Sequence, residues 1–489
     1  MTAARQSGVA RTAPKSRQAE ISPARKTAFD VLMGVVRGPS HSDDLLRGKA
    51  VNALSAPDRN LATALVLGVL RWQIRLDHEL RALLKRPDAR LDPEIGIALR
   101  LGAFQILHMY RIPARAAIDE SVELAKQAGH RFASGMVNAV LRKLAGAPPL
   151  SFSEESPAEL ALAYAHPAWM VERWAGSYGI EAARAVCRHG QSQPLLTLRI
   201  DDPAVEDELA ASGIHLQPGE LLTAARSVIS GDLTASAAFR EGRLCLQDEG
   251  SQLIAELACA ANADPDRSEK RILDACAAPG NKTLILAQRN PTARIVACES
   301  SPQRFEPLRR RLAPLGGRVE CRLVDSTSLA EDSAFDVALA DAPCSGTGTL
   351  GRNPEIRHRL RLEDLTRQAE RQRALLRAAL RAVRPGGRVV YSTCSLEPEE
   401  NEQVVAAVLT DAPDTRQVSL EPRIQDLLDQ AILTPSGADR LKAVLTPDGA
   451  LRLLPGALPT DGFFVCLLER ASHSSAMRLP VRMTSAIGR

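Results

Sequence analysis

Aromatic residues are scarce in this 489-residue chain, where Phe, Trp and Tyr make up 3% of the sequence. That scarcity argues against a surface that stacks many bases on aromatic rings. No apolar run approaches the roughly 18 residues of a membrane span, so we expect no membrane segment. The nine cysteines form no C-x-x-C pair, so zinc-finger spacings are absent and we expect no metal. An odd number of cysteines in apolar runs is typical of reduced thiols in a cytoplasmic protein.

Charge is distributed unevenly along the chain. Residues 1–150 contain 23 Lys and Arg against 13 Asp and Glu, whereas the remainder contains 39 against 45. A basic first part favours a polyanion as its partner, although a solvated basic surface would have the same composition. Residues 1–20 are basic and almost free of acids. We expect them to form a disordered tail that can touch RNA, with a mitochondrial transit segment as the alternative.

The length suggests two or three domains. Residues 21–147 read as all helix, because apolar residues recur at helical spacing in runs such as NLATALVLGVLRWQIRL. The preceding SAPD offers a Ser or Asp cap for that helix. GAPPLSFSEESP has the composition of a linker. Residues 155–250 mix helical patterns with short β-type runs and are interpreted as a small α+β adaptor.

Strand and helix patterns alternate through residues 251–472, with 473–489 as a tail. The runs RILDACA, RIVACE, RVECRLVD, FDVALAD and GRVVYSTC read as strands. The alternation predicts an α/β fold with a Rossmann-like, doubly wound and mostly parallel sheet. Residues 411–460 show no clear pattern and are expected to be a surface excursion. In sheets of this class, ligands bind at the carboxyl ends of the strands.

Acidic residues end four successive strands of this predicted sheet, at Asp274, Glu299, Asp325 and Asp341. A single acid there could be an ordinary helix cap, but four in register indicate a ligand that carries a nucleoside. Gly280 permits a tight turn after the first strand. Glu299 follows it by nineteen residues, which is where related sheets bind a ribose diol.

The turn after the first strand narrows the choice of nucleoside ligand. It has one glycine, not the G-x-G-x-x-G of a dinucleotide site, and around Lys282 and Thr283 it lacks both glycines of the P-loop pattern G-x-x-x-x-G-K-[ST]. Acids around the site would also repel phosphates. A cationic nucleoside without phosphates, S-adenosylmethionine, fits these features.

Two cysteines follow predicted strands at the same edge: Cys344 in DAPCSGTG and Cys394 in VVYSTCS. A thiolate that adds to C6 of cytosine makes C5 nucleophilic enough to take a methyl group. An acid such as Asp341 can bond N3 of the base, and a second group must help release the product. The residues alone leave open which cysteine attacks. Small buried hydrophobic roles are expected for five other cysteines: Cys187, Cys259, Cys298, Cys321 and Cys466.

The motifs DACAAPGNKT, DAPCSGTG and STCSLEPEENEQVV resemble those of the RNA cytosine-5 methyltransferases. ARKTAFDVL, AIDESVELAK and GMVNAVLRKL resemble a NusB-type RNA-binding domain. Together they resemble the bacterial 16S ribosomal RNA cytosine-5 methyltransferases of the RsmB (Sun) type. This resemblance implies an S-adenosylmethionine-dependent enzyme that forms 5-methylcytosine in small-subunit ribosomal RNA, as a cytoplasmic monomer. Transfer RNA as the substrate, and a non-catalytic NusB-like assembly factor, are the alternatives.

The resemblance also implies residue roles. Cys394 would be the nucleophile, Cys344 would assist product release, and Asp341 would lie between cofactor and base. Glu299, where Asp is common, would bind the ribose hydroxyls, and Asp325 would lie by the adenine. The methionine end of the cofactor would be wrapped by Cys276, Ala277, Ala278, Pro279, Gly280, Asn281 and Lys282.

Two positions depart from the family pattern. Asn281 replaces a glycine, and we expect the loop to keep its shape, because Asn tolerates the left-handed conformation better than most residues. Gly351 replaces the first of two arginines, which leaves Arg352 as the candidate RNA contact, with a surface salt bridge as the alternative.

Overall fold

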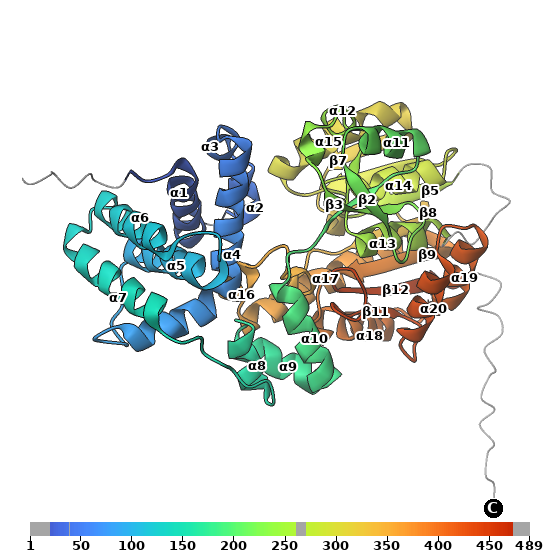
Figure 1. Ribbon diagram of the computed structural model, residues 1–489. Helices are drawn as coiled ribbons and strands as arrows, with labels where there is room; N and C mark the ends of the chain where they lie inside the picture. The colour runs from blue at the N-terminus through green and yellow to red at the C-terminus, as the bar shows by residue number, and fades with distance from the viewer. Residues whose placement is uncertain (1–19, 39, 261–269, 473–489) are drawn as a thin grey trace, which may run out of the picture. The chain divides into compact units, whose positions relative to one another are not determined.

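The computed structural model describes residues 20–38, 40–260 and 270–472. The predicted tails therefore lie outside the described residues, except for residue 20. The chain divides into two units, Met1–Phe152 and Ser153–Arg489, and each is described by itself (Figure 1).

The first unit is entirely helical in its described part, as the hydrophobic periodicity predicts. Ser55 caps the long helix α4, because its hydroxyl accepts a hydrogen bond from the backbone N–H of Asp58 at 3.3 Å. The ring of Phe104 packs directly on Gly68, where a Cβ atom would lie only 2.0 Å from the ring. The helices are α1 (Pro23–Arg37), α2 (Ser42–Leu46), α3 (Lys49–Asn52), α4 (Ala56–Leu83), α5 (Pro93–His108), α6 (Ala114–Gln127) and α7 (Ser134–Gly146).

The second unit begins with helices and a four-stranded antiparallel sheet in the order β2-β3-β1-β4. The run from His166 to Gly190, which reads as one helix, is two helices separated at Gly179, whose φ of +86° suits glycine. The elements are α8 (Pro157–Ala163), α9 (Ala168–Tyr178), α10 (Ile180–Gln191), β1 (Leu196–Arg199), α11 (Pro203–Ala211), β2 (His215–Pro218), β3 (Ala225–Ser230), α12 (Ala237–Arg240) and β4 (Cys245–Leu246).

An eight-stranded mixed sheet forms the rest of this unit, in the order β10-β12-β9-β8-β5-β6-β7 with β11 paired to β12. Strands β9, β8, β5, β6 and β7 run parallel, and β10, β11 and β12 add antiparallel pairings. This is the predicted Rossmann-like sheet. Its strands are β5 (Arg271–Asp274), β6 (Arg294–Glu299), β7 (Val319–Leu323), β8 (Phe335–Asp341), β9 (Val383–Thr393), β10 (Thr415–Val418), β11 (Leu451–Leu453) and β12 (Phe463–Arg470).

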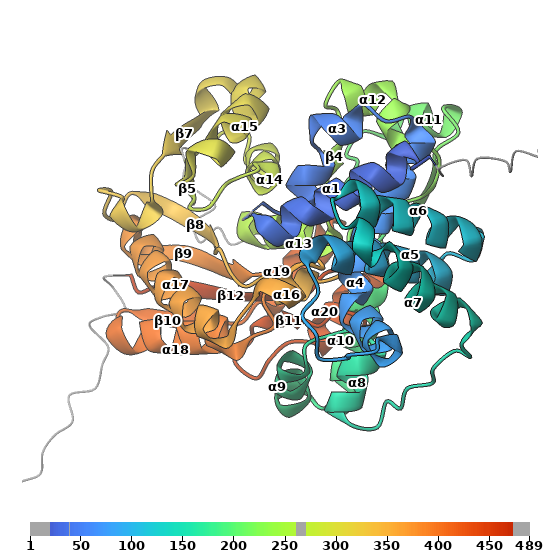
Figure 2. The same cartoon turned by 90° about the vertical axis from the view of Figure 1, so that its left-hand side faces the viewer.

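Helices cover both faces of the large sheet (Figures 1 and 2). Successive strand residues point to opposite faces, so Ile272 of β5 joins the core under α13 and α14, while Leu273 joins the core under α17 and α18. Both faces are therefore apolar, as expected for a parallel sheet. The helices are α13 (Glu249–Ala260), α14 (Asn281–Arg289), α15 (Pro302–Leu312), α16 (Ile356–Arg359), α17 (Leu362–Ala382), α18 (Glu402–Asp411), α19 (Glu421–Asp429) and α20 (Pro435–Ala443).

Residues 411–460 do not form the predicted surface excursion. They supply the edge strand β10, the short strand β11 and the helices α19 and α20. Ile424, Leu441 and Leu451 are fully buried in the core on the α13 side of the sheet. The prediction is wrong because these elements are short and their apolar residues are sparse in sequence, so burial is set by tertiary packing.

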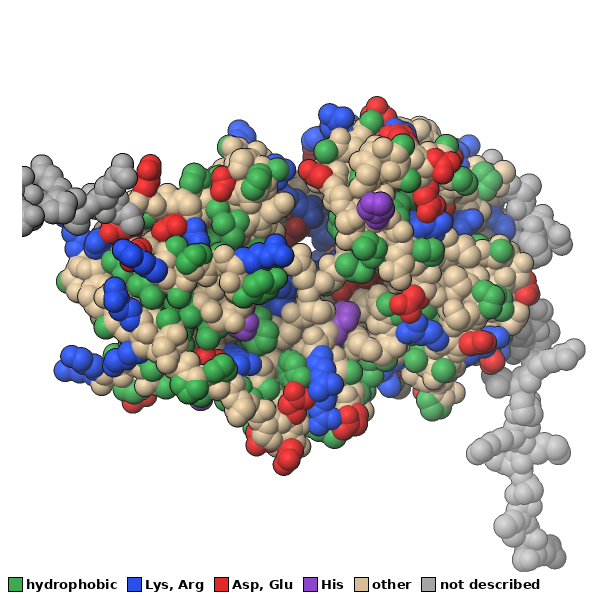
Figure 3. Space-filling model, in the orientation of Figure 1, with side chains coloured by type: hydrophobic (Ala, Val, Ile, Leu, Met, Phe, Trp, Pro, Cys, Tyr) green, Lys and Arg blue, Asp and Glu red, His purple; other side chains and the backbone are tan. Residues whose placement is uncertain are grey.

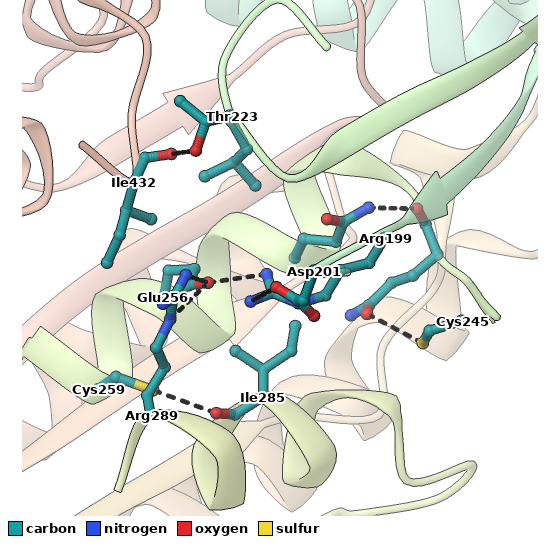
Figure 4. A network of polar contacts seen from close by, with 12 residues as sticks. Arg199, Asp201, Thr223, Cys245, Glu256, Cys259, Ile285, Arg289 and Ile432 are labelled. Atoms are coloured by element: carbon teal, nitrogen blue, oxygen red, sulfur yellow. Dashed lines mark hydrogen bonds and ion pairs between the residues drawn. The ribbon is translucent and has the colours of Figure 1, made fainter. Parts of the chain in front are cut away.

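A buried ionic network joins the small sheet to the large one (Figure 4). The carboxylate of Glu256 on α13 accepts from Arg199 of β1 at 2.7 Å and from Arg289 of α14 at 2.9 Å. Arg199 and Glu256 are both buried. Such a network is costly to break, since without Glu256 the buried Arg199 would keep only Asp201 among the carboxylates that it contacts here, and Arg289 would lose its carboxylate. The network therefore fixes β1 against α13 and α14, which cover the large sheet.

Candidate active site

The two candidate cysteines lie together. Strands β8 and β9 pair in parallel, with Asp341 opposite Ser392, so the residues that follow them meet at one edge of the sheet. The sulfur atoms of Cys344 and Cys394 are 3.3 Å apart. The backbone N–H of Gly348 donates to the carbonyl oxygen of Cys394 at 2.9 Å, which holds the two loops in register.

The thiol of Cys344 is held in its protonated form. The hydrogen bond to Cys394, together with burial, raises the pKa of the Cys344 thiol well above its ordinary value. Cys344 therefore keeps its proton at neutral pH and can donate it to the sulfur of Cys394. That arrangement is suited to one nucleophilic sulfur with a protonated thiol beside it.

An ion pair lies next to the cysteines. The ammonium of Lys282 contacts Asp341 Oδ2 at 2.7 Å, and the Ser392 hydroxyl donates to Asp341 Oδ1 at 2.7 Å. Burial alone would lower the pKa of Lys282, but the charges of Asp341 and Asp274 outweigh it, so the pKa is raised. Lys282 also interacts electrostatically with Cys394. A permanent cation of this kind stabilises a thiolate.

A buried carboxylate that the sequence does not single out supports both cysteine loops. Glu400, in the 3-10 turn η6 (Pro398–Glu400), accepts from the backbone N–H and the hydroxyl of Ser345 and from the hydroxyl of Ser395. The side-chain amide of Gln372 on α17 also donates to it at 3.0 Å. Ser345 and Ser395 each follow one of the two cysteines directly. In the sequence Glu400 lies within the motif STCSLEPEENEQVV, but the motif does not indicate which of its acids is buried.

A cavity of about 190 Å³ opens at the ends of β5, β6 and β7. Glu299 and Asp325 both line it, together with Cys276, Pro343 and Arg371. The structure thus brings together three of the predicted cofactor residues in one cavity. Burial raises the pKa of Cys276 well above its ordinary value, so this third thiol stays protonated.

The two acids of the cavity are partly engaged by the protein itself. Glu299 accepts from the backbone N–H of Ser301 at 2.8 Å and lies 3.6 Å from the guanidinium of Arg304. Asp325 caps the turn η4 (Ser326–Ser328), and the backbone N–H of Thr327 lowers the pKa of that carboxyl. Both groups keep acceptor capacity for hydroxyl or amino donors.

The loop that precedes α14 makes the expected tight turn at Gly280, without a contribution from the backbone of Asn281. Gly280 takes the left-handed conformation, with φ of +103°, and a cis peptide joins Ala278 to Pro279. Asn281 is the first residue of α14, so the tolerance of Asn for a left-handed backbone plays no part in this turn. Its side chain donates to the carbonyl of Leu246 at 2.9 Å and accepts from Arg311 at 2.7 Å.

Asp274, which the sequence marks only as a strand-end acid, has a more specific environment in the structure. Thr283 donates to its Oδ2 at 2.7 Å, while Oδ1 is buried without a partner among the described residues. Burial raises the pKa of Asp274 to about 6. An unsatisfied buried carboxylate oxygen beside this loop is an acceptor that a cationic ligand could satisfy.

Arg352 is held by two carboxylates of the protein. Its guanidinium contacts Asp461 at 2.7 Å and Asp248 at 3.1 Å. The predicted RNA-contacting arginine therefore takes part in salt bridges with two largely buried carboxylates, whereas the alternative left open by the sequence was a surface salt bridge. Among the other cysteines, Cys187, Cys298 and Cys466 are fully buried, whereas Cys259 and Cys321 are half-buried.

No group of three or more His, Cys, Asp or Glu side chains able to hold a metal occurs within residues 20–38, 40–260 and 270–472. In the same described segments, no helix is both long and apolar enough to span a bilayer.

Three family models match the chain. Residues 261–469 match 16S rRNA methyltransferase RsmB/F, residues 22–146 match the NusB family, and residues 166–225 match the ferredoxin-like domain of RsmF/B-like methyltransferases. The chain is 32% identical over 460 residues to a probable ribosomal RNA small subunit methyltransferase B of Bacillus subtilis, covering 91% of this chain and 98% of that one. It is 31% identical to the ribosomal RNA small subunit methyltransferase B of Pseudomonas putida, over 81% and 91% of the two chains.

Solved structures share the fold. The crystal structure of PH0851 superposes with a TM-score of 0.72 at 24% identity, covering 93% of this chain and all of that one. A methyltransferase homolog from Pyrococcus horikoshii has a TM-score of 0.50 at 25% identity and covers 66% of this chain and all of that one.

Proposed function

Because this chain belongs to the 16S rRNA methyltransferase RsmB/F family and is an RNA methyltransferase, we propose that it forms 5-methylcytosine in small-subunit ribosomal RNA. The methyl donor is S-adenosylmethionine, and the reaction passes through a covalent bond between Cys394 and C6 of the base. One observation carries this proposal. Two thiols lie 3.3 Å apart beside a lysine–aspartate ion pair, at the strand ends where the cofactor cavity also opens.

The thiols have separate tasks. Cys394 attacks C6 as a thiolate, which forms a C–S bond and moves the C5–C6 double-bond electrons so that C5 becomes nucleophilic. Lys282 stabilises the attacking anion. In the adduct N3 of the base takes a proton from water, Asp341 would accept a hydrogen bond from that N3–H, and the proton leaves again when the C–S bond breaks. The raised pKa of Cys344 keeps it as a thiol, so it can donate a hydrogen bond to the sulfur of Cys394. After C5 is methylated, its proton leaves to water, the double bond re-forms and the C–S bond breaks with Cys394 as the stabilised leaving group.

The cavity residues fit the cofactor. When bound, S-adenosylmethionine supplies an electrophilic methyl group on a positively charged sulfur. Glu299 would accept from the ribose hydroxyls and Asp325 from the adenine amino group, since both acids line one cavity. The unsatisfied Oδ1 of Asp274 would accept from the cofactor ammonium. The loop from Cys276 to Lys282 would enclose the methionine end, with Gly280 providing the close approach.

The helical unit would supply RNA affinity. Figure 3 shows several Lys and Arg side chains on its visible face. Tyr110 and Phe132 are also unusually uncovered for aromatic residues, at 89% and 81% exposed, and an exposed ring can stack on an unpaired base. We therefore assign residues 21–147 to RNA binding, 155–250 to an adaptor and 251–472 to catalysis. We further propose that the protein is a monomer and acts in the cytoplasm.

A trapping experiment tests the chemistry. Cys344→Ala removes the thiol that assists release but leaves Cys394 in place. We expect this variant, incubated with S-adenosylmethionine and in vitro transcribed small-subunit ribosomal RNA, to accumulate a protein–RNA adduct that survives denaturing electrophoresis. The double variant Cys344→Ala/Cys394→Ala should form none, and Cys321→Ala serves as a control cysteine outside the site. An adduct that forms in Cys394→Ala instead would exchange the two roles.

A further inference from the structure

A second cavity, of about 230 Å³, lies in the methyltransferase unit. It is lined by residues next to β1, by the turn after β2 and by the loop that precedes β12. None of the cofactor-cavity residues lines it. It is therefore a separate hollow of the same unit, and the proposed chemistry leaves it unused.

Two polar atoms of residues that line this cavity lack partners. Asp461 is 3% exposed, and its Oδ2 is held by Arg352 at 2.7 Å. Its Oδ1 is buried and has no hydrogen-bond partner in the described part of the chain, and the same holds for Nε2 of His189. Buried polar atoms are normally hydrogen-bonded. Two such atoms on residues that line one hollow are candidates for hydrogen bonds to a ligand there.

The walls indicate what kind of ligand fits. Pro194, Leu195, Pro218 and Pro459 line the cavity, and Leu195 is 51% exposed. These apolar surfaces suit a flat ring. The charged groups are mostly acidic, because Glu220, Asp248, Glu249 and Asp461 face a single arginine, Arg352. Such a lining repels phosphate and favours a neutral ligand that carries hydrogen-bond donors.

The acids other than Asp461 are already satisfied by the protein. Glu249 accepts from the backbone N–H groups of residues 220, 221 and 222. Asp248 accepts from Arg352 and from the backbone N–H of Gly250. Glu220 pairs with Arg440. The acceptor left for a ligand is therefore Asp461 Oδ1.

The cavity is close to the reacting cysteine. The N–H of Gly348 bonds the carbonyl of Cys394, and the N–H of Gly462 bonds the carbonyl of Gly348 at 2.8 Å. Gly462 directly follows Asp461. Two hydrogen-bonded steps of roughly 5 Å each, and one further residue along the chain, therefore separate Cys394 from Asp461. An RNA strand that presents its target base to Cys394 passes within reach of this cavity.

We propose that this cavity binds an unpaired base that neighbours the target cytosine, and that it selects adenine or cytosine over uracil and guanine. The inference rests on the proposed function. The amino group of adenine or cytosine would donate to Asp461 Oδ1, and the adjacent ring nitrogen would accept from His189 Nε2. Burial raises the pKa of Asp461 to about 7, and above that pH uracil and guanine present a carbonyl oxygen to an ionised carboxylate, which stays unpaired. Burial lowers the pKa of His189, so its ring is neutral and carries one N–H at pH 7.

Binding of short RNAs to the full chain tests the proposal without turnover. The probes are fluorescent U-rich single strands with one central cytosine, in which each neighbouring position is A, C, G or U. For the wild-type protein we expect one neighbouring position at which A or C binds about 5- to 100-fold tighter than U or G. Asp461→Asn should reduce that ratio to about 2-fold or less, since an amide can rotate to face either a donor or an acceptor.

The matched control is Glu220→Gln, which removes one negative charge at the same cavity from a carboxylate already paired with Arg440. It should keep the full base preference. His189→Leu gives a second test of the readout and should also reduce the preference, and binding of sinefungin by each variant verifies that the site has folded.

Four results would overturn the proposal or its premise. A wild-type protein without base preference, or Asp461→Asn that retains it, would overturn the proposal. Equal losses in Glu220→Gln and Asp461→Asn would overturn it too, because they would indicate charge alone. Suppose that Asp461→Asn abolishes the base preference but the wild-type chain transfers no methyl group. That result would support base binding in this cavity and refute the proposed function.

Discussion

Glu400 should control the rate of methyl transfer without touching the cofactor or the base. Its carboxylate is fully buried and receives four hydrogen bonds, from the backbone and hydroxyl of Ser345, from Ser395 and from Gln372. The two serines are the residues that directly follow the two cysteines. Glu400 is therefore a positioning residue, and its replacement should displace the sulfur atoms relative to each other.

The size of the effect follows from the bonds that are lost. Hydrogen bonds to a charged acceptor contribute about 1.5–3 kcal/mol each, and neutral ones about 0.5–1.5 kcal/mol. Glu400→Gln keeps one oxygen for the backbone N–H of Ser345 and lets the hydroxyls rotate to accept, so we expect a loss of stability of about 1–2 kcal/mol. Glu400→Ala removes the acceptor shared by the backbone N–H of Ser345, the two serine hydroxyls and Gln372, and should cost about 3 kcal/mol or more.

Activity should fall more than stability in Glu400→Gln. A small displacement of a reacting group can reduce a rate by about 100-fold, so we expect a kcat lower by about 10-fold or more, with an unchanged KM for S-adenosylmethionine. Urea unfolding and initial rates of methyl transfer measure both quantities. Glu370→Gln, an exposed acid on α17, is the control. A wild-type kcat in Glu400→Gln would refute the positioning role of Glu400. A KM for S-adenosylmethionine that rises by the same factor as kcat falls would refute it too.

Three further predictions concern stability. Glu256→Gln should lower the free energy of unfolding by about 3 kcal/mol, because it leaves the charges of Arg199 and Arg289 poorly compensated. The control is Glu241→Gln, whose carboxylate pairs with Arg243 on the surface. An equal loss of stability in the two variants would contradict the prediction. The pKa of Asp274 is raised to about 6 in the folded state, from 3.8 when the residue is exposed. Between these two pH values the native state binds a proton that the unfolded state has released. The free energy of unfolding should therefore fall by about 3 kcal/mol as the pH rises from 3.8 to about 6. Asp274→Asn should remove this pH dependence. If the wild type and Asp274→Asn had identical pH profiles of unfolding, the raised pKa of Asp274 would be refuted. Asn281→Gly should cost about 1 kcal/mol, because the side chain makes two hydrogen bonds and the residue is helical; a gain in stability would mean that a left-handed backbone is needed there after all.

Local patterns in the sequence are sufficient to predict much of the fold. The alternation of apolar runs and turn residues identifies the five parallel strands, because each strand is short, apolar and followed by an acid or a cysteine. Strand-end position then brings Cys344, Cys394 and Asp341 to one edge without any knowledge of side-chain contacts. Position 299 and position 325 reach the same cavity for the same reason.

Contacts between distant segments cannot be predicted in this way. Glu400 reads as one acid in the run EPEEN, and its burial depends on Ser345, which lies 55 residues earlier in the chain. The backbone preference of Asn281 predicts a left-handed residue, whereas Leu246 and Arg311 fix its side chain at the start of a helix. Arg352 reads as a surface cation, and its two carboxylate partners come from residues 248 and 461. In each case the deciding neighbour is remote in sequence.

The most direct test is methyl transfer from labelled S-adenosylmethionine to in vitro transcribed small-subunit ribosomal RNA, with position-resolved detection of the modified base. We predict 5-methylcytosine at a single position, formed by the wild-type chain and by Cys321→Ala but not by Cys394→Ala. Transfer to transfer RNA alone would contradict the proposed substrate. A methyl group on any other base or atom, or undiminished transfer by Cys394→Ala, would contradict the proposed chemistry.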